Sequence, residues 1–148
     1  MDLQHKLLLV SLCLLLRTSL ASRPEGEAEA LLRWRSTLLS STSLSLWSLA
    51  NPTCSWFGVT CDAAGHVTKL HLSNAGLNGT LHTLYSTALQ NLTWLDLSSN
   101  DLFDAIPANI SMFLTLSVLE LSTSNFSGAI PGKQPPDQPR ICQALTYS

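Results

Sequence analysis

Apolar residues from Val67 onward follow a fixed period. Six positions recur in the same register in three successive rows of sequence, and the rows align without a gap. The rows are Val67, Leu70, Leu72, Leu77, Gly79 and Leu81; Leu92, Leu95, Leu97, Leu102, Asp104 and Ile106; and Leu116, Leu119, Leu121, Phe126, Gly128 and Ile130. The shift is 25 positions from the first row to the second and 24 from the second to the third. A period of this kind is typical of proteins built from stacked repeats.

Each row predicts one short strand. In a Leu-x-Leu pattern the leucines point to one side of the strand and the residues between them to the other. The period then brings the next strand beside the last, which predicts an α/β solenoid with a parallel sheet along one face. A generic leucine-rich helical protein is disfavoured, because glycine and proline recur in phase (Pro107, Pro131) and would break a helix in every row. Asn100 follows the second strand, and its side-chain amide is expected to hydrogen-bond to backbone groups of adjacent repeats. Ala75 and Ser124 hold the same position in the first and third rows.

The segment 24–39 has the pattern of an amphipathic helix. Pro24 suits a first helical turn, and three glutamates favour the N-terminal end of the helix dipole. Apolar side chains recur at steps of three and four residues, and the Ser/Thr-rich stretch 40–45 is expected to end the helix. The glutamates are Glu25, Glu27 and Glu29, and the apolar stripe includes Ala28, Leu31, Trp34 and Leu38.

Residues 47–62 are loop-like but rich in aromatic side chains, which predicts a cover over an open hydrophobic end. The aromatic residues are Trp47, Trp56 and Phe57. In an oxidising compartment Cys54 and Cys61 can pair across their short loop. A zinc site built from these cysteines with His66 and His71 is the alternative. It is disfavoured, because the cysteines are farther apart in the sequence than the ligand pairs of zinc sites usually are.

Residues 1–21 read as a secretory signal. The apolar run 7–16 is too short to cross a bilayer, since a helix of that length spans about 15 Å. Ser19 and Ala21 give the small-x-small pattern of a cleavage site, so the mature chain is expected to begin near Ser22 and to leave the cell. A buried N-terminal helix and an uncleaved anchor are the alternatives. Cys13 would leave with the signal, and Cys142 is expected to stay unpaired within the monomer.

Composition and charge narrow the function classes. The chain is 45% hydrophobic and only 12% charged, with 8 basic and 10 acidic residues and a formal net charge of −2. This balance disfavours nucleic acid as a partner, which would call for a concentrated positive field. The sequence contains no G-x-S-x-G nucleophile motif and no phosphate-binding loop, so we expect neither an enzyme nor a bound cofactor or metal.

Two segments resemble the plant-specific leucine-rich-repeat family, the extracellular part of receptor-like kinases, receptor-like proteins and polygalacturonase inhibitors. Residues 54–62 (CSWFGVTCD) look like its N-terminal cap motif, and residues 92–110 (LTWLDLSSNDLFDAIPANI) are similar to its repeat. The resemblance implies a right-handed superhelix with a helical, disulfide-stapled cap and ligand binding on the concave or lateral face. The expected domains are a signal (1–21), a cap (22–66), repeats at 67–91, 92–115 and 116–132, and a disordered non-repeat tail (133–148).

The sequence departs from the family pattern at several points. Asp104 stands where the repeat usually has glycine. Three repeats are fewer than the family commonly has, and the proline-rich tail resembles no C-terminal cap, which predicts a truncated receptor. The open end is expected to expose an apolar patch, to make the chain marginally stable and to allow self-association. Residues 116–130 should then exchange amide hydrogens faster than residues 67–82. The patch would comprise Leu119, Leu121, Phe126 and Ile130.

A binding face is predicted from the outward positions of the three strands. These are Lys69 and His71, Trp94 and Asp96, and Val118 and Glu120, with Ser73, Ser98 and Ser122 beyond them. Trp94 is the foremost hot-spot candidate, since tryptophan offers a large contact area at low entropic cost. Packing against its sheet neighbours is the alternative role.

Four sequons predict N-linked glycans: Asn78, Asn91, Asn109 and Asn125. Asn91 and Asn109 are expected in loops and are favoured.

The pattern favours a non-catalytic extracellular recognition protein. Its expected ligand is a protein, a peptide or a glycan, or another leucine-rich-repeat receptor. A polygalacturonase inhibitor-like protein and a gene fragment without a function of its own are the alternatives. The inhibitor ranks lower, because three short strands offer little concave surface.

Overall fold

A computed structural model describes residues 3–6 and 25–128 of the chain. Several predictions fall outside these residues: the apolar run 7–16, cleavage after Ala21, the place of Pro24, the tail 133–148 and the state of Cys142. The described elements beyond residue 25 are α2 (Glu27–Thr37), η1 (Thr42–Leu44), η2 (Thr53–Ser55), β1 (Val59–Cys61), β2 (Val67–His71), β3 (Asn78–Gly79), η3 (Thr87–Leu89), β4 (Trp94–Asp96), β5 (Asp101–Ala105), η4 (Ala108–Met112), β6 (Val118–Glu120) and β7 (Asn125–Ser127).

The main sheet has four strands in the order β1-β2-β4-β6. Strands β2, β4 and β6 are parallel, and Leu70 pairs with Leu95, which pairs with Leu119. These three leucines hold the same position in the three rows of sequence, so the pairing confirms the alignment of the rows. Strand β1 adds to β2 in the antiparallel direction, so the segment before the repeats extends the same sheet.

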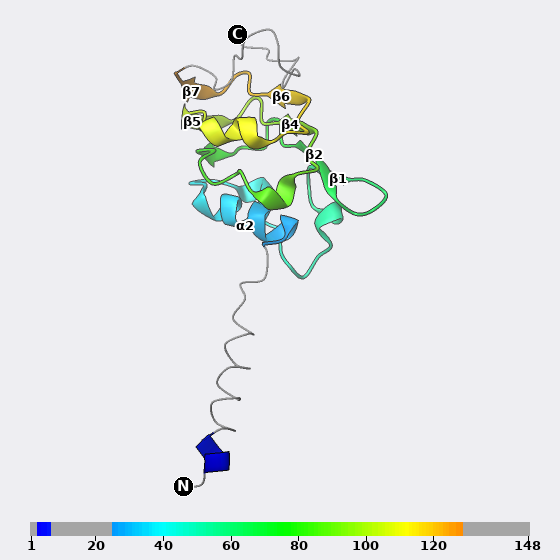
Figure 1. Cartoon of the computed structure of the whole chain (residues 1–148). Coiled ribbons are helices and arrows are strands. Elements are labelled where there is room, and N and C mark those ends of the chain that lie inside the picture. Colours follow the sequence, from blue (N-terminus) through cyan, green and yellow to red (C-terminus); the bar gives the residue numbers. More distant parts are fainter. Residues whose placement is uncertain (1–2, 7–24, 129–148) are drawn as a thin grey trace, which may run out of the picture.

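A second sheet, with the order β3-β5-β7, was not predicted. Its strands are short and follow the leucine strands after a turn; Gly79 pairs with Leu102, and Asp104 with Phe126. They carry glycine, serine and aspartate among single apolar residues, so they lack the alternation by which a strand is recognised. Figure 1 shows the strands of both sheets stepping away from α2 toward the C-terminal end.

The leucines of the rows form one buried core. An exposed apolar patch was predicted at the C-terminal end. The prediction is wrong for two of its four residues, because Leu119 and Leu121 are only 1% and 4% exposed. Both belong to the same core cluster as the leucines of the preceding repeat, while Phe126 is partly buried against it and Ile130 lies outside the described residues.

Helix α2 is shorter than predicted. It begins at Glu27, after Gly26, and ends at Thr37, because Leu38 is already extended and residues 39 and 40 hydrogen-bond to Asn78. The predicted stripe packs as expected: Leu31 and Trp34 are fully buried, with Ala28 and Leu38 partly buried beside them.

Polar contacts fix α2 against the first repeat. The indole Nε1 of Trp34 donates to the carbonyl of Thr80 at 3.0 Å, and the backbone N–H of Val67 donates to the carboxylate of Glu27 at 2.9 Å. Helix and repeat are thereby held in one arrangement.

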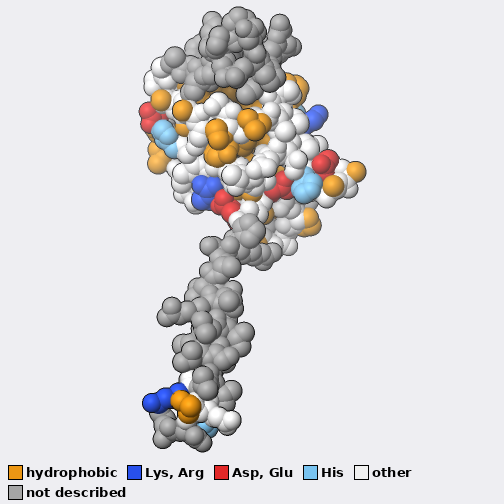
Figure 2. Space-filling model, viewed as in Figure 1, with side chains coloured by type: hydrophobic (Ala, Val, Ile, Leu, Met, Phe, Trp, Pro, Cys, Tyr) orange, Lys and Arg blue, Asp and Glu red, His pale blue; other side chains and the backbone are white. Residues whose placement is uncertain are grey.

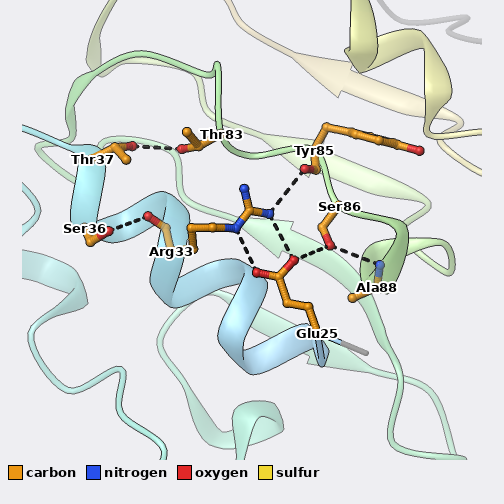
Figure 3. A network of polar contacts seen from close by, with 8 residues as sticks. All are labelled: Glu25, Arg33, Ser36, Thr37, Thr83, Tyr85, Ser86 and Ala88. Carbon is orange, nitrogen blue, oxygen red and sulfur yellow. Dashed lines mark hydrogen bonds and ion pairs between the residues drawn. The ribbon is translucent and has the colours of Figure 1, made fainter. Parts of the chain in front are cut away.

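A second link joins the start of the cap to residues 85–88 (Figure 3). Arg33 donates to both carboxylate oxygens of Glu25, at 2.8 and 3.1 Å, and Ser86 donates to the same carboxylate at 2.9 Å. The hydrogen bonds from Arg33 lower the pKa of Glu25 most, against a smaller opposing effect of burial, and Ser86 adds to the lowering. The carboxylate is therefore held in its charged form.

Asn100 occupies the predicted slot and links two repeats. Its Oδ1 accepts from the backbone N–H groups of Ala75 and Leu77, both at 3.0 Å. Its Nδ2 donates to the carbonyls of Leu72 at 2.8 Å and Leu97 at 2.9 Å. Each of these groups is thereby satisfied by one buried side chain, as expected from the sequence.

The cap loop is built on two stacked indoles and a disulfide. The rings of Trp47 and Trp56 lie 5.2 Å apart and both are buried, whereas Phe57 is exposed. Cys54 and Cys61 form the predicted disulfide, with their Cα atoms 5.6 Å apart. Among the described residues no group of three or more potential ligands could hold a metal ion.

Removal of the disulfide should destabilise the chain. The Cys54→Ser, Cys61→Ser double variant is expected to lose about 2–3 kcal/mol of unfolding free energy, because an open loop has more conformational freedom in the unfolded state. Urea unfolding of both proteins, followed by circular dichroism, measures the difference. Serine at the partly exposed Thr53 is the matched control and should change little. Equal unfolding midpoints for the double variant and the wild type would contradict the expectation.

Candidate binding surface on the four-stranded sheet

The four-stranded sheet brings the six predicted face residues together in two rows. Strand pairing aligns Lys69 with Trp94 and Trp94 with Val118. The same pairing aligns a second row, which contains His71, Asp96 and Glu120. The neighbouring leucines are buried on the other side, so the alternation of the strands assigns all six residues to one face.

Trp94 lies at the centre of the first row. The Nζ atom of Lys69 is 5.8 Å from the centroid of its ring, within the range of a cation–π contact. The ring of His71 lies 5.7 Å away at a tilt of 40°. Trp94 thus packs on its sheet neighbours, which is the alternative role considered for it, and still keeps part of its surface exposed. Its role as a hot spot stays a prediction.

The indole Nε1 of Trp94 is buried and has no hydrogen-bond partner in the structure. An unpaired buried donor is costly, by about 1–3 kcal/mol in general. Because this atom is buried, a ligand that lies on the face would contact the indole ring rather than Nε1.

The second row has a polar border. Oδ1 of Asp96 accepts from the backbone N–H of Ser98 at 3.1 Å and from its hydroxyl at 2.6 Å. The Ser98 hydroxyl is also 2.8 Å from that of Ser73. The carboxylate of Asp96 is therefore held in place by its own turn.

Charge is divided across this face. Lys69 and His71 come from β2, whereas Asp96 and Glu120 come from β4 and β6. A ligand that crosses the strands therefore meets basic groups near β1 and acidic groups farther along. Elsewhere, on the side drawn in Figure 2, charged side chains are scattered rather than gathered.

A second polar pair lies on the three-stranded side and was not predicted. Nε2 of His82 and Oδ2 of Asp104 are 3.1 Å apart, and both side chains are about half exposed. The hydrogen bond from His82, helped by the backbone N–H of Ala105, lowers the pKa of the Asp104 carboxyl. The sequence showed that Asp104 stands where the repeat usually has glycine, but it did not show that His82 pairs with it.

The sequons lie in four different settings. Asn78 is in β3, Asn91 is in the turn before β4, Asn109 is in η4 and Asn125 opens β7. The expectation that Asn109 lies in a loop is wrong, because residues 108–112 form a short 3-10 helix.

The cap and the repeats both have counterparts among known proteins. Residues 24–62 match the leucine rich repeat N-terminal domain. The chain is 41% identical over 105 residues to MDIS1-interacting receptor like kinase 2 of Arabidopsis thaliana, covering 67% of this chain and 10% of that protein. The chain spans only about a tenth of the length of such curated relatives. No helix among the described residues is long and apolar enough to cross a membrane.

Solved structures agree. The BIR2 ectodomain from Arabidopsis thaliana is 30% identical with a TM-score of 0.65, covering 74% of this chain and 60% of that one. The structure titled PEPR1-AtPEP1 is 31% identical with a TM-score of 0.63, covering 71% of this chain and 15% of that one. Residues 24–62 are thus a leucine-rich-repeat N-terminal domain, and the chain is similar to the N-terminal part of plant leucine-rich-repeat receptor-like kinases and receptor-like proteins.

Proposed function

We propose that the protein is a non-catalytic extracellular recognition module whose ligand binds the face defined by Lys69, His71, Trp94, Asp96, Val118 and Glu120. The observation that carries this proposal is the partly exposed ring of Trp94, flanked by the side chains of Lys69 and His71. A large aromatic side chain beside polar groups is the usual centre of a binding hot spot.

The ligand class follows from the same face. A protein or peptide segment can lay an acidic side chain beside Lys69 and His71 and an apolar group on the ring of Trp94. PEPR1, a structural relative, was solved with AtPEP1, which supports a ligand of this kind. A glycan or a second leucine-rich-repeat receptor is the alternative occupant.

The wider organisation belongs to the same proposal. A right-handed solenoid with α2 and the disulfide loop as its helical cap would make the four-stranded sheet the concave face. The cap would span residues 22–66 and the repeats 67–91, 92–115 and 116–132. Residues 1–21 would direct the chain into the apoplast and be removed after about Ala21. Leu119 and Leu121 are buried, so self-association through the C-terminal end would have to use other residues of that end, and it stays a prediction.

A binding experiment tests the face. The full chain, recovered from the medium of expressing plant cells, is immobilised and exposed to the peptide fraction of apoplastic fluid, and retained peptides are synthesised and titrated. Trp94→Ala should weaken their binding by about thirty-fold or more, the effect of losing roughly 2 kcal/mol at a hot spot. Lys69→Ala, at an exposed position, should weaken binding without changing the fold.

Leu114→Ala is the matched control, because it removes an exposed apolar side chain, 78% accessible, that lies outside the sheet. Thermal unfolding monitors the fold of each variant. Peptides whose affinity survives both sheet substitutions would contradict the proposed face, and retention of no peptide at all would contradict the proposed peptide ligand.

A further inference from the structure

We infer that the folded protein carries N-linked glycans at Asn91 and Asn125 and none at Asn78 and Asn109. The sequence alone gives all four the same acceptor motif. The fold separates them, because a glycosylated carboxamide and its first sugar must stand in water. The inference rests on the proposed extracellular location.

Asn91 stands in an open turn. Its side chain is exposed, between η3 and β4, and the next residue, Leu92, points into the core. The hydroxyl of Thr93, the third residue of the sequon, donates to the carbonyl of Thr68 at 3.0 Å and helps to hold the turn. A sugar on Asn91 would therefore extend into solvent without moving the leucine below it.

Asn125 opens strand β7, and strand alternation sets its direction. Asn125 and Ser127 are exposed, whereas Phe126 between them is partly buried against the core. The backbone of Asn125 pairs with Phe103 of β5. The ladder thus holds the backbone while the carboxamide faces outward, which leaves room for a glycan.

Asn78 lies in a closed junction between the cap and the first repeat. Its backbone N–H donates to the carbonyl of Ser40 at 3.0 Å, and its carbonyl accepts from Leu39 at 2.8 Å. Its side-chain Oδ1 is buried without a partner. At the following Gly79 a Cβ atom would lie only 2.9 Å from Leu38. A glycan on Nδ2 of this half-buried side chain would stand directly beside the tight contact that joins cap and repeat, and we expect that crowding to exclude it.

Asn109 is held in a similar way on another element. It lies in η4 and is half-buried, and its Oδ1 is buried without a partner. The next residue, Ile110, is buried in the core. A glycan on Nδ2 of this half-buried side chain would crowd the short helix that packs Ile110. Molecules with a sugar at Asn78 or Asn109 are therefore expected to fold poorly and to be lost before secretion.

The two inferred glycans lie outside the strands of the proposed binding face. Neither Asn91 nor Asn125 belongs to the four-stranded sheet, and Asn125 lies in the other sheet. A glycan at Asn125 would therefore leave the proposed binding face free, whereas Asn91 precedes Trp94 by only three residues, so a glycan there would stand at the edge of that face.

Peptide mapping of the full chain tests this inference. The protein is purified from the medium of expressing plant cells and treated, in heavy-oxygen water, with a glycosidase that converts each glycosylated Asn to labelled Asp. We expect conversion at Asn91 and Asn125 and none at Asn78 and Asn109. Conversion at either junction site, or a missing label at either exposed site, would overturn the inference.

Single variants give an independent measurement. Asn91→Gln and Asn125→Gln should each remove one glycan step in gel mobility, whereas the matched Asn78→Gln and Asn109→Gln variants should leave the mobility unchanged. A secreted protein without sugar would refute this inference and leave the binding proposal standing. An unmodified chain that remains in the cytosol would refute both the glycan assignment and the extracellular location.

Discussion

Asn100→Ala is expected to lower the unfolding free energy by about 3 kcal/mol or more, because each buried group left unpaired costs roughly 1–3 kcal/mol. Alanine removes the acceptor for the N–H groups of Ala75 and Leu77 and the donor for the carbonyls of Leu72 and Leu97. The equivalent residue of the first repeat, Ala75, has no polar side-chain atom that could replace these hydrogen bonds. Urea unfolding of the secreted chain measures the loss.

Two further variants bracket this expectation. Asn51→Ala makes the same chemical change at an exposed asparagine with a single 3.3 Å bond to Leu46, and should cost less than about 0.5 kcal/mol. Ser124→Asn should raise stability, because Ser124 keeps only a 3.4 Å contact to the carbonyl of Leu97 where an amide could reach further groups. If Asn100→Ala lost no more unfolding free energy than Asn51→Ala, the hydrogen bonds of the Asn100 side chain would not contribute to stability.

The slot of Asn100 illustrates what the sequence could predict. The repeat period fixes which residues of successive strands become neighbours, and strand alternation fixes which face each side chain takes. Pairing of Lys69 with Trp94 and of Trp94 with Val118 follows from these two rules. The disulfide between Cys54 and Cys61 could be predicted from their short spacing together with the predicted secretory signal.

Other features depend on contacts that no local pattern records. The second sheet forms because the turn after each leucine strand brings the following residues beside those of the next repeat. Asp104 takes a φ of 73° where the other rows have glycine, and it meets His82 of the preceding repeat. Helix α2 ends early because Asn78, which is distant in the sequence, takes the next backbone groups. The burial of Leu119 likewise depends on packing across repeats rather than on composition.

The cap and the proposed binding face share one edge, and Gly58 is the residue that joins them. Its carbonyl accepts from the backbone N–H of His71 at 2.7 Å, next to the pairing of Val59 with Leu70. His71 in turn contacts the ring of Trp94. The position of the first basic group on the face therefore depends on how closely the cap approaches β2.

Gly58→Ala is expected to destabilise the chain by about 3 kcal/mol, through positive φ and through steric overlap, each worth roughly 1–3 kcal/mol. Gly58 has a φ of 75°, and a Cβ atom there would lie 2.5 Å from both the carbonyl oxygen of His71 and a methyl group of Leu72. The backbone oxygen cannot rotate away as a flexible side chain could, so β1 must move from β2. Thermal and urea unfolding should show the loss, and the affinity of any ligand bound at His71 should fall with it.

Gly76→Ala separates the two causes. Gly76 has a similar φ of 64°, but a Cβ atom there would meet nothing within 4 Å. This variant should therefore lose only the conformational part, about 1 kcal/mol, and should leave ligand binding unchanged. The difference between the two variants measures the steric contact between cap and sheet. If both alanines cost the same and ligand affinity survives in both, Gly58 is needed only for its backbone conformation, and the cap does not position His71.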